Sequence, residues 1–432
     1  MRCVMPAAVV LLALGLPTCV AAKDWPGFRG GPSGTAASDD TGLPTTWSDT
    51  ENIAWKVPLP GNGSSSPIVS GDRIFLTCYT GYGQERGNPG DQQKLARSLV
   101  CLNRADGKIL WEKSVPAVLP EDAYGGRMTD HGYASHTPAT DGKKVFVFFG
   151  KSGVLAFDFD GKQLWQTSVG TGSGRMGWGS GTSVLLHKNL VIVNANAESQ
   201  AIVALDQETG NQVWKAASSG YGGSWSTPVL LDVGGKQELI VNMPDEVWSL
   251  DPNDGGLWWY CSGLKSSPNT SVAARDGVVY TLGGGPGGSG AGAIRAGGRN
   301  DVTSSHVVWK KNVGSYVPSP VMSGEYLCWI DDKGVACCLK AETGEQKYRE
   351  RLGGAGSTYA SMIAADGKLY AVSRRNGTFV LAAGPEFKQL AHNKLASDTS
   401  DFNASPAVSN GCLLLRSDKF LYCISGSKPK TE

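Results

Sequence analysis

One short pattern of apolar and polar positions recurs along the whole chain. Its clearest copy starts with an apolar, β-branched run from Ile202 to Leu205, turns through Asp206 and Gly210, and ends at Trp214. Such runs, separated by Asp and Gly, are typical of strands joined by tight turns. The pattern therefore predicts a β-hairpin whose large apolar side chain can be buried only against a neighbouring copy.

The copies are evenly spaced. Successive turn positions at Asp158, Asp206, Asp251, Arg295 and Lys340 lie 44 to 48 residues apart. A period of about 40–50 residues, with four short strands per unit, is typical of β-propellers. Eight copies can be counted, and they account for nearly all of the chain.

A second marker gives the same count. A small residue opens each unit, directly before an apolar run. The eight openings are Ser66-Pro67, Thr137-Pro138, Thr182-Ser183, Thr227-Pro228, Thr270-Ser271, Ser319-Pro320, Ala360-Ser361 and Ser405-Pro406. The sequence therefore predicts an all-β fold, an eight-bladed β-propeller.

The units divide the chain into four segments. Residues 1–22 have a basic start, an apolar run of about ten residues and a small-residue cleavage site, as in a secretory signal peptide. We expect an irregular arm at 23–51, the propeller at 52–426 and a disordered tail at 427–432. The signal predicts export to the periplasm or the extracellular space. Lipid anchoring at Cys19 is not expected, because the residues before it form a poor lipoprotein motif.

The first and last units are each incomplete. Residues 52–57 read as an outer strand without inner strands, whereas the unit that ends near Ile424 lacks its Trp strand. We expect the N-terminal strand to complete the last blade, because ring closure removes open sheet edges that invite aggregation.

Charge and cysteine content limit the partners and cross-links. The formal net charge is +1, which does not favour nucleic acid as a partner. The apolar run of the signal is too short to span a bilayer, and we expect a monomer. Export would permit disulfides, and hairpin geometry predicts Cys328 opposite Cys337 and Cys412 opposite Cys423. The alternative, that these cysteines are small buried hydrophobes, stays open.

Long loops gather on one predicted face. The two major insertions, 79–96 and 115–135, fall on the face that also carries the loops around the channel mouth. Long loops on a rigid scaffold commonly carry function. The candidate ligand-binding residues on this face are Arg127, His131, His136, Arg175, Trp178, Trp225, Asp401 and Asn403. They suit a protein or small-molecule ligand, and the alternative is that they brace the loops.

The Leu-Asp-x-x-Thr-Gly-x-x-x-Trp pattern of residues 205–214 resembles the pyrroloquinoline-quinone (PQQ) repeat. That family includes the eight-bladed quinoprotein alcohol dehydrogenases and the non-enzymatic outer-membrane assembly factor BamB. The resemblance covers about residues 52–425 and implies that the Trp side chains dock blade to blade. By match these are Trp55, Trp111, Trp165, Trp214, Trp259 and Trp309. Tyr348 and Leu390 depart from the pattern, so blades six and seven are expected to dock less tightly.

For the enzymes of the family, the resemblance implies a calcium ion, a catalytic Asp, a stacking Trp and a vicinal disulfide beside the quinone. Cys337-Cys338 looks like that disulfide, but it lies in a predicted strand and not in a loop at the mouth. Asn194, Asn196 and Glu198 alternate along a predicted strand, where their oxygens could suit calcium or simply face solvent.

The other candidate chemistry is incomplete. His131 and His136 could bind zinc, but no further ligands complete a site. We therefore expect no metal and no cofactor, and predict an exported, non-catalytic propeller that binds or scaffolds through its insertion-bearing face. The alternative is a PQQ- and calcium-dependent dehydrogenase of alcohols or sugars.

Overall fold

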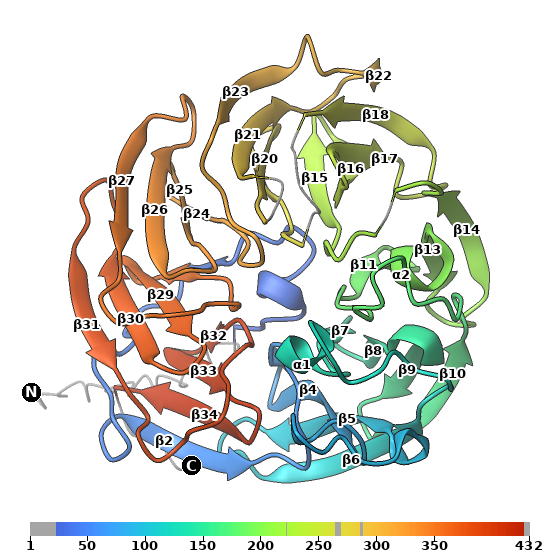
Figure 1. Cartoon of the computed structure of the whole chain (residues 1–432), viewed down its shortest axis with the longest axis vertical. Coiled ribbons are helices and arrows are strands. Elements are labelled where there is room, and N and C mark those ends of the chain that lie inside the picture. The colour runs from blue at the N-terminus through green and yellow to red at the C-terminus, as the bar shows by residue number, and fades with distance from the viewer. Residues whose placement is uncertain (1–22, 222, 264–268, 286–287, 427–432) are drawn as a thin grey trace, which may run out of the picture.

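A computed structural model describes residues 23–221, 223–263, 269–285 and 288–426 of the chain. The predicted signal peptide with Cys19 and the predicted tail at 427–432 lie outside these residues. Eight β-sheets of the described chain stand around a central channel, which confirms the eight-bladed propeller (Figure 1). Each sheet has four strands in antiparallel order, and two sheets carry one further short strand.

The strands of each blade are given from the channel outward. Blade 1 contains β3 (Ile68–Ser70), β4 (Arg73–Thr80), β5 (Ala96–Asn103) and β6 (Ile109–Pro116). Blade 2 contains β7 (Ala139–Thr140), β8 (Lys144–Phe148), β9 (Val154–Asp158) and β10 (Gln163–Thr167). Blade 3 contains β11 (Leu185–His187), β12 (Leu190–Ala195), β13 (Ala201–Asp206) and β14 (Gln212–Ala217). Blade 4 contains β15 (Val229–Val233), β16 (Lys236–Met243), β17 (Glu246–Leu250), β18 (Leu257–Ser262) and β22 (Asn300–Asp301).

The second half of the ring repeats this order. Blade 5 contains β19 (Ala273–Arg275), β20 (Val278–Gly283), β21 (Gly290–Arg295) and β23 (Val307–Lys311). Blade 6 contains β24 (Val321–Ser323), β25 (Tyr326–Ile330), β26 (Val335–Lys340) and β27 (Gln346–Arg351). Blade 7 contains β28 (Ile363–Ala365), β29 (Lys368–Ser373), β30 (Gly377–Ala382) and β31 (Gln389–Asn393), with β1 (Ala37–Ser38) beside β28. Blade 8 contains β32 (Ala407–Ser409), β33 (Cys412–Arg416), β34 (Phe420–Ser425) and β2 (Ile53–Pro58).

The helices are short. They are the 3-10 turns η1 (Phe28–Gly30), η2 (Gln92–Lys94) and η3 (Gly150–Ser152), and the single-turn helices α1 (Met128–His131) and α2 (Asn196–Ser199). Within the described residues, no helix has the length and apolar character needed to cross a bilayer.

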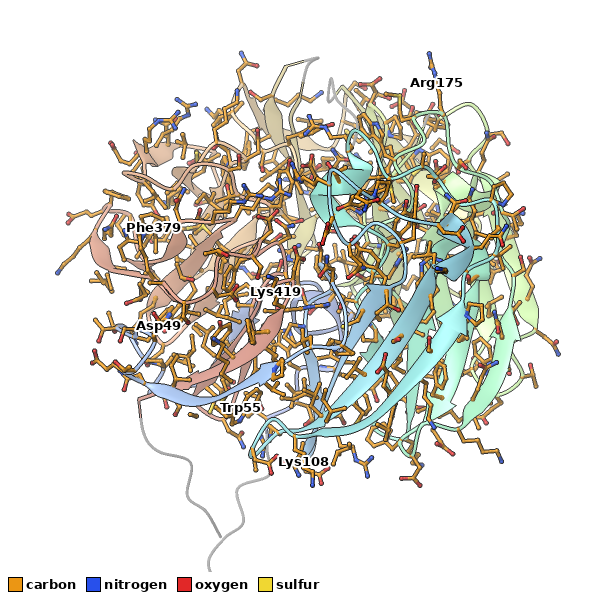
Figure 2. The ribbon with its side chains drawn as sticks, turned by 60° about the horizontal axis from the view of Figure 1, so that its bottom comes forward. Asp49, Trp55, Lys108, Arg175, Phe379 and Lys419 are labelled. Atoms are coloured by element: carbon orange, nitrogen blue, oxygen red, sulfur yellow. The ribbon has the colours of Figure 1, made fainter. Side chains whose placement is uncertain are left out.

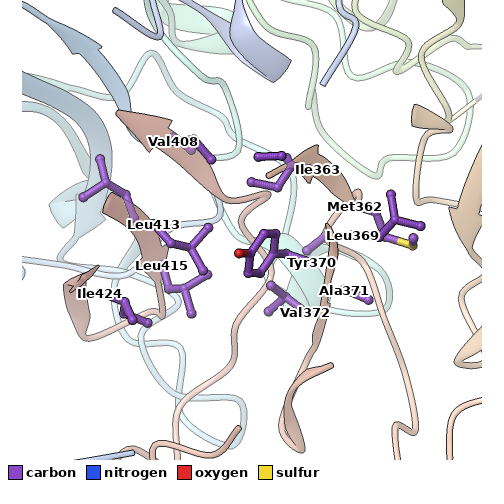
Figure 3. Close-up of a cluster of buried hydrophobic side chains, with 14 of the residues drawn as sticks. Met362, Ile363, Leu369, Tyr370, Ala371, Val372, Val408, Leu413, Leu415 and Ile424 are labelled. Atoms are coloured by element: carbon purple, nitrogen blue, oxygen red, sulfur yellow. The ribbon is translucent and has the colours of Figure 1, made fainter. Parts of the chain in front are cut away.

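The ring closes where the first strand meets the last blade. β2 pairs antiparallel with β34, with Trp55 opposite Cys423 and Val57 opposite Leu421. This is the predicted closure. The apolar core beside it joins blades 7 and 8, where Tyr370 and Leu413 are fully buried (Figure 3).

The repeated Trp side chains bridge neighbouring blades. The indole nitrogen of Trp165 donates to the carbonyl of Gln207 in the next blade, at 3.0 Å. A side chain at Gly210 would meet that indole at 2.7 Å, and Gly210 has a φ of +72°. The glycine of one blade is therefore needed both for the conformation of its turn and to leave room for the Trp side chain of the preceding blade. The same bond joins Trp55 to Arg104, Trp111 to Phe159, Trp214 to Pro252 and Trp309 to Ala341.

Three blades depart from this arrangement. Trp259 donates to Glu238 of its own blade, at 2.8 Å, instead of to the next blade. Tyr348 of blade 6 packs edge-on against Phe387 of blade 7, with ring centroids 5.6 Å apart. In blade 7 the register places Ala391 at the docking position, opposite Val380. The interpretation of Leu390 as the docking residue was wrong, because Leu390 precedes the docking position by one residue and its side chain is exposed.

Residues 23–51 do more than lie on the propeller. Trp25 forms a β-bridge with Val69 of blade 1, and β1 pairs in parallel with β28 of blade 7. Between them, η1 enters the centre of the ring (blue in Figure 1). Arg29 is buried there, and its guanidinium donates to the carbonyls of Val272 and Pro320 in blades 5 and 6. Burial lowers the pKa of Arg29 to about 9. This arm therefore closes the lower end of the channel.

The sheet registers correct both predicted cysteine pairs. The turn from Asp331 to Gly334 leaves Cys338 opposite Cys328, and Cys337 opposite Trp329. A shift of one residue moves a side chain to the other face of a sheet, so Cys337 points away from Cys328. In blade 8, Cys412 lies opposite Ser425 and not opposite Cys423, but the two thiols are diagonal neighbours on one face and interact with each other.

Candidate functional site

A ring of hydroxyl groups surrounds the channel just inside its upper mouth. We call these residues the collar: Ser66, Thr137, Ser183, Thr227, Ser271, Ser319, Ser361 and Ser405. In seven links around the ring, a backbone N–H of one collar residue donates to the hydroxyl oxygen of the next, at 2.9–3.1 Å. These are the small residues that open each unit in the sequence, and the collar gives their physical role.

The collar hydroxyls retain unused hydrogen-bond donors. All eight side chains are buried and line a cavity of about 190 Å³ at the channel mouth, here called the mouth cavity. Within the described residues, seven of these hydroxyls accept one backbone hydrogen bond each, and that of Ser66 accepts none. No collar hydroxyl donates to a protein acceptor in the described part of the chain. A hydroxyl that accepts a bond can still donate its own hydrogen. The cavity is therefore rich in donors.

Aromatic rings form much of the remaining lining of the mouth cavity. Trp178 and Trp225 lie on successive loops, with ring centroids 5.4 Å apart, and Tyr316 and Tyr359 also line the cavity. Phe28 of the arm lines both this cavity and a second one beneath it, so its ring separates the two. The cavity is closed below and opens on the face that carries the insertions.

The charged groups at the mouth form a closed network. Asp130 accepts hydrogen bonds from Arg374 (3.0 Å), Arg127 (3.4 Å) and the Tyr359 hydroxyl (3.1 Å). Burial alone would raise the pKa of Asp130, but these donors hold it below its usual value. Asp130 is therefore an ionised carboxylate whose oxygens are occupied. Arg374, which sequence reasoning missed, carries no motif that marks it.

His131 serves as a brace within the wall of the cavity. Its Nε2 lies 2.9 Å from the carbonyl oxygen of Trp178, and its Nδ1 lies 2.8 Å from the Ser135 hydroxyl. Because a carbonyl can only accept, Nε2 carries the proton of the neutral ring. Burial lowers the pKa of His131, which favours this neutral form. His131 thereby fixes the loop that presents Trp178.

The structure separates the other predicted site residues. Arg175 is exposed, lies outside the mouth cavity and points away from the ring (Figure 2). Asp401 is buried in ion pairs with Arg374 (2.8 Å) and Arg375. Asn403 lines the cavity and donates to the carbonyl of Asp130 at 2.9 Å. Five of the eight predicted residues thus line one cavity, namely Arg127, His131, Trp178, Trp225 and Asn403.

His136 lies in a separate buried chamber behind the cavity wall. The chamber has a volume of about 10 Å³ and is lined by Arg97, Glu121, Asp122, Lys151 and Glu198, among others. Both ring nitrogens of His136 lack a partner among the described residues, as does Glu198 Oε2. Arg97 and Glu121 form an ion pair at 2.7 Å. A space of this size holds about one water molecule, and His136 has no contact with the mouth cavity.

The three alternating residues 194, 196 and 198 do not share a face. β12 ends at Ala195 and α2 begins at Asn196. Asn194 donates to Ser224 and Ser226, Asn196 donates to Ser218, and Glu198 enters the chamber. Within the described residues, no group of three or more His, Cys, Asp or Glu side chains is placed to hold a metal ion.

The buried chamber predicts a pH-dependent stability. Burial raises the pKa of Glu198 to about 7, from an ordinary value of 4.5. Between these values the folded chain holds a proton that the unfolded chain has released, so this group lowers stability as pH rises. The Glu198→Gln variant should match the wild type near pH 4.5 and exceed it at pH 8, by up to about 3 kcal/mol. Urea unfolding at both pH values measures the difference.

Glu121→Gln provides the control for this prediction. It removes a carboxylate of the same chamber, but one that is paired with Arg97. This variant should be less stable than the wild type at pH 8, because it leaves a buried guanidinium without its partner. His136, Asp122 and Lys151 are present in both variants, so the two variants differ only in which carboxylate of the chamber is removed. A Glu198→Gln effect that is equal at the two pH values would contradict the assignment.

Comparison with known proteins identifies the family. A profile described as outer membrane protein assembly factor BamB matches residues 93–224 and 245–384, more than half of the chain. The chain belongs to the BamB family. The crystal structure of BamB from Moraxella catarrhalis superposes with a TM-score of 0.60 at 15% identity, covering 86% of this chain and 96% of that one.

Enzymes also resemble this BamB-family chain. A quinohemoprotein alcohol dehydrogenase from Pseudomonas putida HK5 has a TM-score of 0.58 at 11% identity, over 95% of this chain and 81% of that one. The tetrathionate hydrolase of Acidithiobacillus ferrooxidans is 24% identical over 197 residues, which cover 43% of this chain and 35% of that protein. The chain spans about a third of the length of the curated relatives it matches. These similarities establish the shared propeller fold.

The residues of this BamB-family chain do not fit a calcium–quinone site. Cys337 and Cys338 belong to β26, where they face different apolar clusters on opposite sides of blade 6. Asp130 lines the mouth, but its oxygens are occupied by Arg and Tyr donors. A calcium ion needs six to eight oxygen ligands, commonly with several carboxylates among them, and within the described residues no group of three or more acidic, His or Cys side chains gathers to hold one.

Proposed function

We propose that the chain is an exported, non-catalytic propeller that binds its ligand in the mouth cavity. The observation that carries this proposal is the combination of a donor-rich collar, aromatic walls and a closed floor in one cavity. Ligand sites typically combine apolar walls with a small number of polar groups at fixed positions. The fold of BamB and the insertions beside the mouth support binding through this face.

The lining defines the chemistry of the ligand. The collar contributes hydroxyl donors, and Arg127 adds a half-exposed guanidinium at the rim. The guanidinium of Arg127 can only donate, and the oxygens of Asp130 already accept from Arg374 and Tyr359, so Asp130 offers no free carboxylate to a cationic ligand. The favoured ligand, or side chain of a protein partner, therefore presents hydrogen-bond acceptors and an apolar face that can pack against Trp178 and Trp225.

Replacing Arg127 with alanine is expected to weaken ligand binding. Anchors of this kind commonly contribute about 2 kcal/mol or more, which is roughly thirtyfold in affinity. Ligands are found by thermal shift over a panel of small carboxylates, neutral polar compounds and short acidic peptides, and then titrated by calorimetry. Arg175→Ala is the matched control, since that Arg is on the same face but outside the cavity. Its affinity should remain that of the wild type.

Two outcomes would contradict this proposal. Equal losses in the Arg127 and Arg175 variants would move the site out of the mouth cavity. Reduction of a dye in the presence of PQQ, calcium and an alcohol or sugar would favour the dehydrogenase alternative. Under the proposed function, addition of PQQ and calcium leaves the protein inactive toward the whole substrate panel.

A further inference from the structure

Two cysteines face each other inside blade 6. Cys328 on β25 and Cys338 on β26 are register partners in the antiparallel sheet, and their sulfur atoms lie 3.6 Å apart. Both side chains are fully buried. They belong to the same apolar cluster, so they point to the same side of the blade.

The backbone spacing at this position suits a disulfide. Directly opposed residues of antiparallel strands have Cα atoms about 4.5 or 5.5 Å apart. Disulfides form at Cα separations of about 4.4–6.8 Å, with sulfur atoms about 2.0 Å apart. Rotation of the two side chains can therefore bring the sulfurs together without a change in the strand register.

The neighbouring cysteine cannot take part in this bond. Cys337 precedes Cys338 in β26, lies opposite Trp329 and packs in the cluster on the other side of the blade. Adjacent residues of a strand point to opposite faces. Cys337 was predicted from the sequence as the partner because the hairpin turn was taken to be one residue shorter than it is. Of the two adjacent cysteines, Cys338 therefore faces another cysteine and Cys337 does not.

We propose that Cys328 and Cys338 form a disulfide that links β25 to β26 in the mature protein. The two thiols lose two protons and two electrons to the disulfide of a protein thiol oxidant, which is released as a dithiol. Exchange proceeds through a mixed disulfide, so it takes place before blade 6 packs and buries both residues. This oxidation needs an oxidising compartment, so the inference rests on the export that the proposed function includes.

The bond would reinforce blade 6, one of the blades whose docking residue differs from the repeat. Cys338 lies opposite Tyr348, which stands where most other blades carry Trp. The row Cys328, Cys338 and Tyr348 runs across three strands toward blade 7. A disulfide in this row links β25 to β26, the strand that pairs with β27 at Tyr348, and so fixes the position of the Tyr348 ring.

The test uses the full chain, refolded in oxidised glutathione, unfolded, alkylated and digested for mass spectrometry. The expected result is a linked peptide pair that contains residues 328 and 338. Cys337→Ser should retain the link, whereas Cys338→Ser should lose it and leave Cys328 alkylated. Free, alkylated Cys328 and Cys338 in the oxidised wild type would overturn the proposal, and so would a link to Cys337.

A second measurement separates this inference from the proposed function. The same peptide analysis is applied to protein isolated from its own cells. A linked pair there supports both the disulfide and export. If the pair forms in glutathione but is reduced in the cellular protein, export is contradicted and the pairing of Cys328 with Cys338 is upheld.

Discussion

A chain that lacks residues 23–57 is expected to aggregate instead of folding. The deletion removes Ile53 to Val57 of β2, so β34 loses almost its whole partner strand and exposes a row of backbone donors and acceptors. It also removes the arm, which contacts blades 1 and 7 and places Arg29 in the channel. Size-exclusion chromatography and circular dichroism measure the outcome.

A shorter deletion of residues 23–47 serves as the control. It keeps β2 and therefore the closed ring, but removes η1 and the floor of the mouth cavity. This variant should remain soluble and monomeric with a lower melting temperature. A soluble, monomeric protein with unchanged stability after the longer deletion would contradict closure by β2.

Replacing Trp214 with alanine is expected to lower the free energy of unfolding by about 3–5 kcal/mol. Trp214 is buried at the joint between blades 3 and 4, and its indole donates to the carbonyl of Pro252 at 3.2 Å. The substitution leaves a cavity against Gly255, whose position lies under the indole ring. Denaturant unfolding followed by circular dichroism gives the change.

Val213→Ala is the matched control for the Trp214 variant. Val213 is the preceding residue of β14 and is 51% exposed. Exposed substitutions commonly change stability by less than about 0.5 kcal/mol. Similar losses at positions 213 and 214 would show that the indole does not bridge the blades, and the interpretation of the repeat would be wrong.

The repeat made the fold predictable because each of its residues has a local physical role. Asp206 accepts hydrogen bonds from the backbone of its own turn, and Gly210 adopts the left-handed conformation that the turn needs. The small residues that open each unit were equally visible in the sequence. Their role in the collar was not, because it depends on the spacing between blades across the channel.

The site was harder to predict because loop residues are placed by tertiary contacts. Arg127 and Arg175 look alike in sequence, yet one lines the cavity and the other points away from the ring. The length of a single turn, Asp331 to Gly334, decided whether Cys337 or Cys338 faced Cys328. The buried chamber of Glu198 joins segments from three blades, so no local pattern could mark it.

The closed floor of the mouth cavity restricts how a long molecule can be held. Phe28 and Arg29 occupy the axis of the ring, so an extended polymer cannot thread through the propeller. Such a partner can insert only its end, or one side chain, and must withdraw along the path by which it entered. Under the proposed function, each molecule therefore binds one terminus or one protruding group at a time.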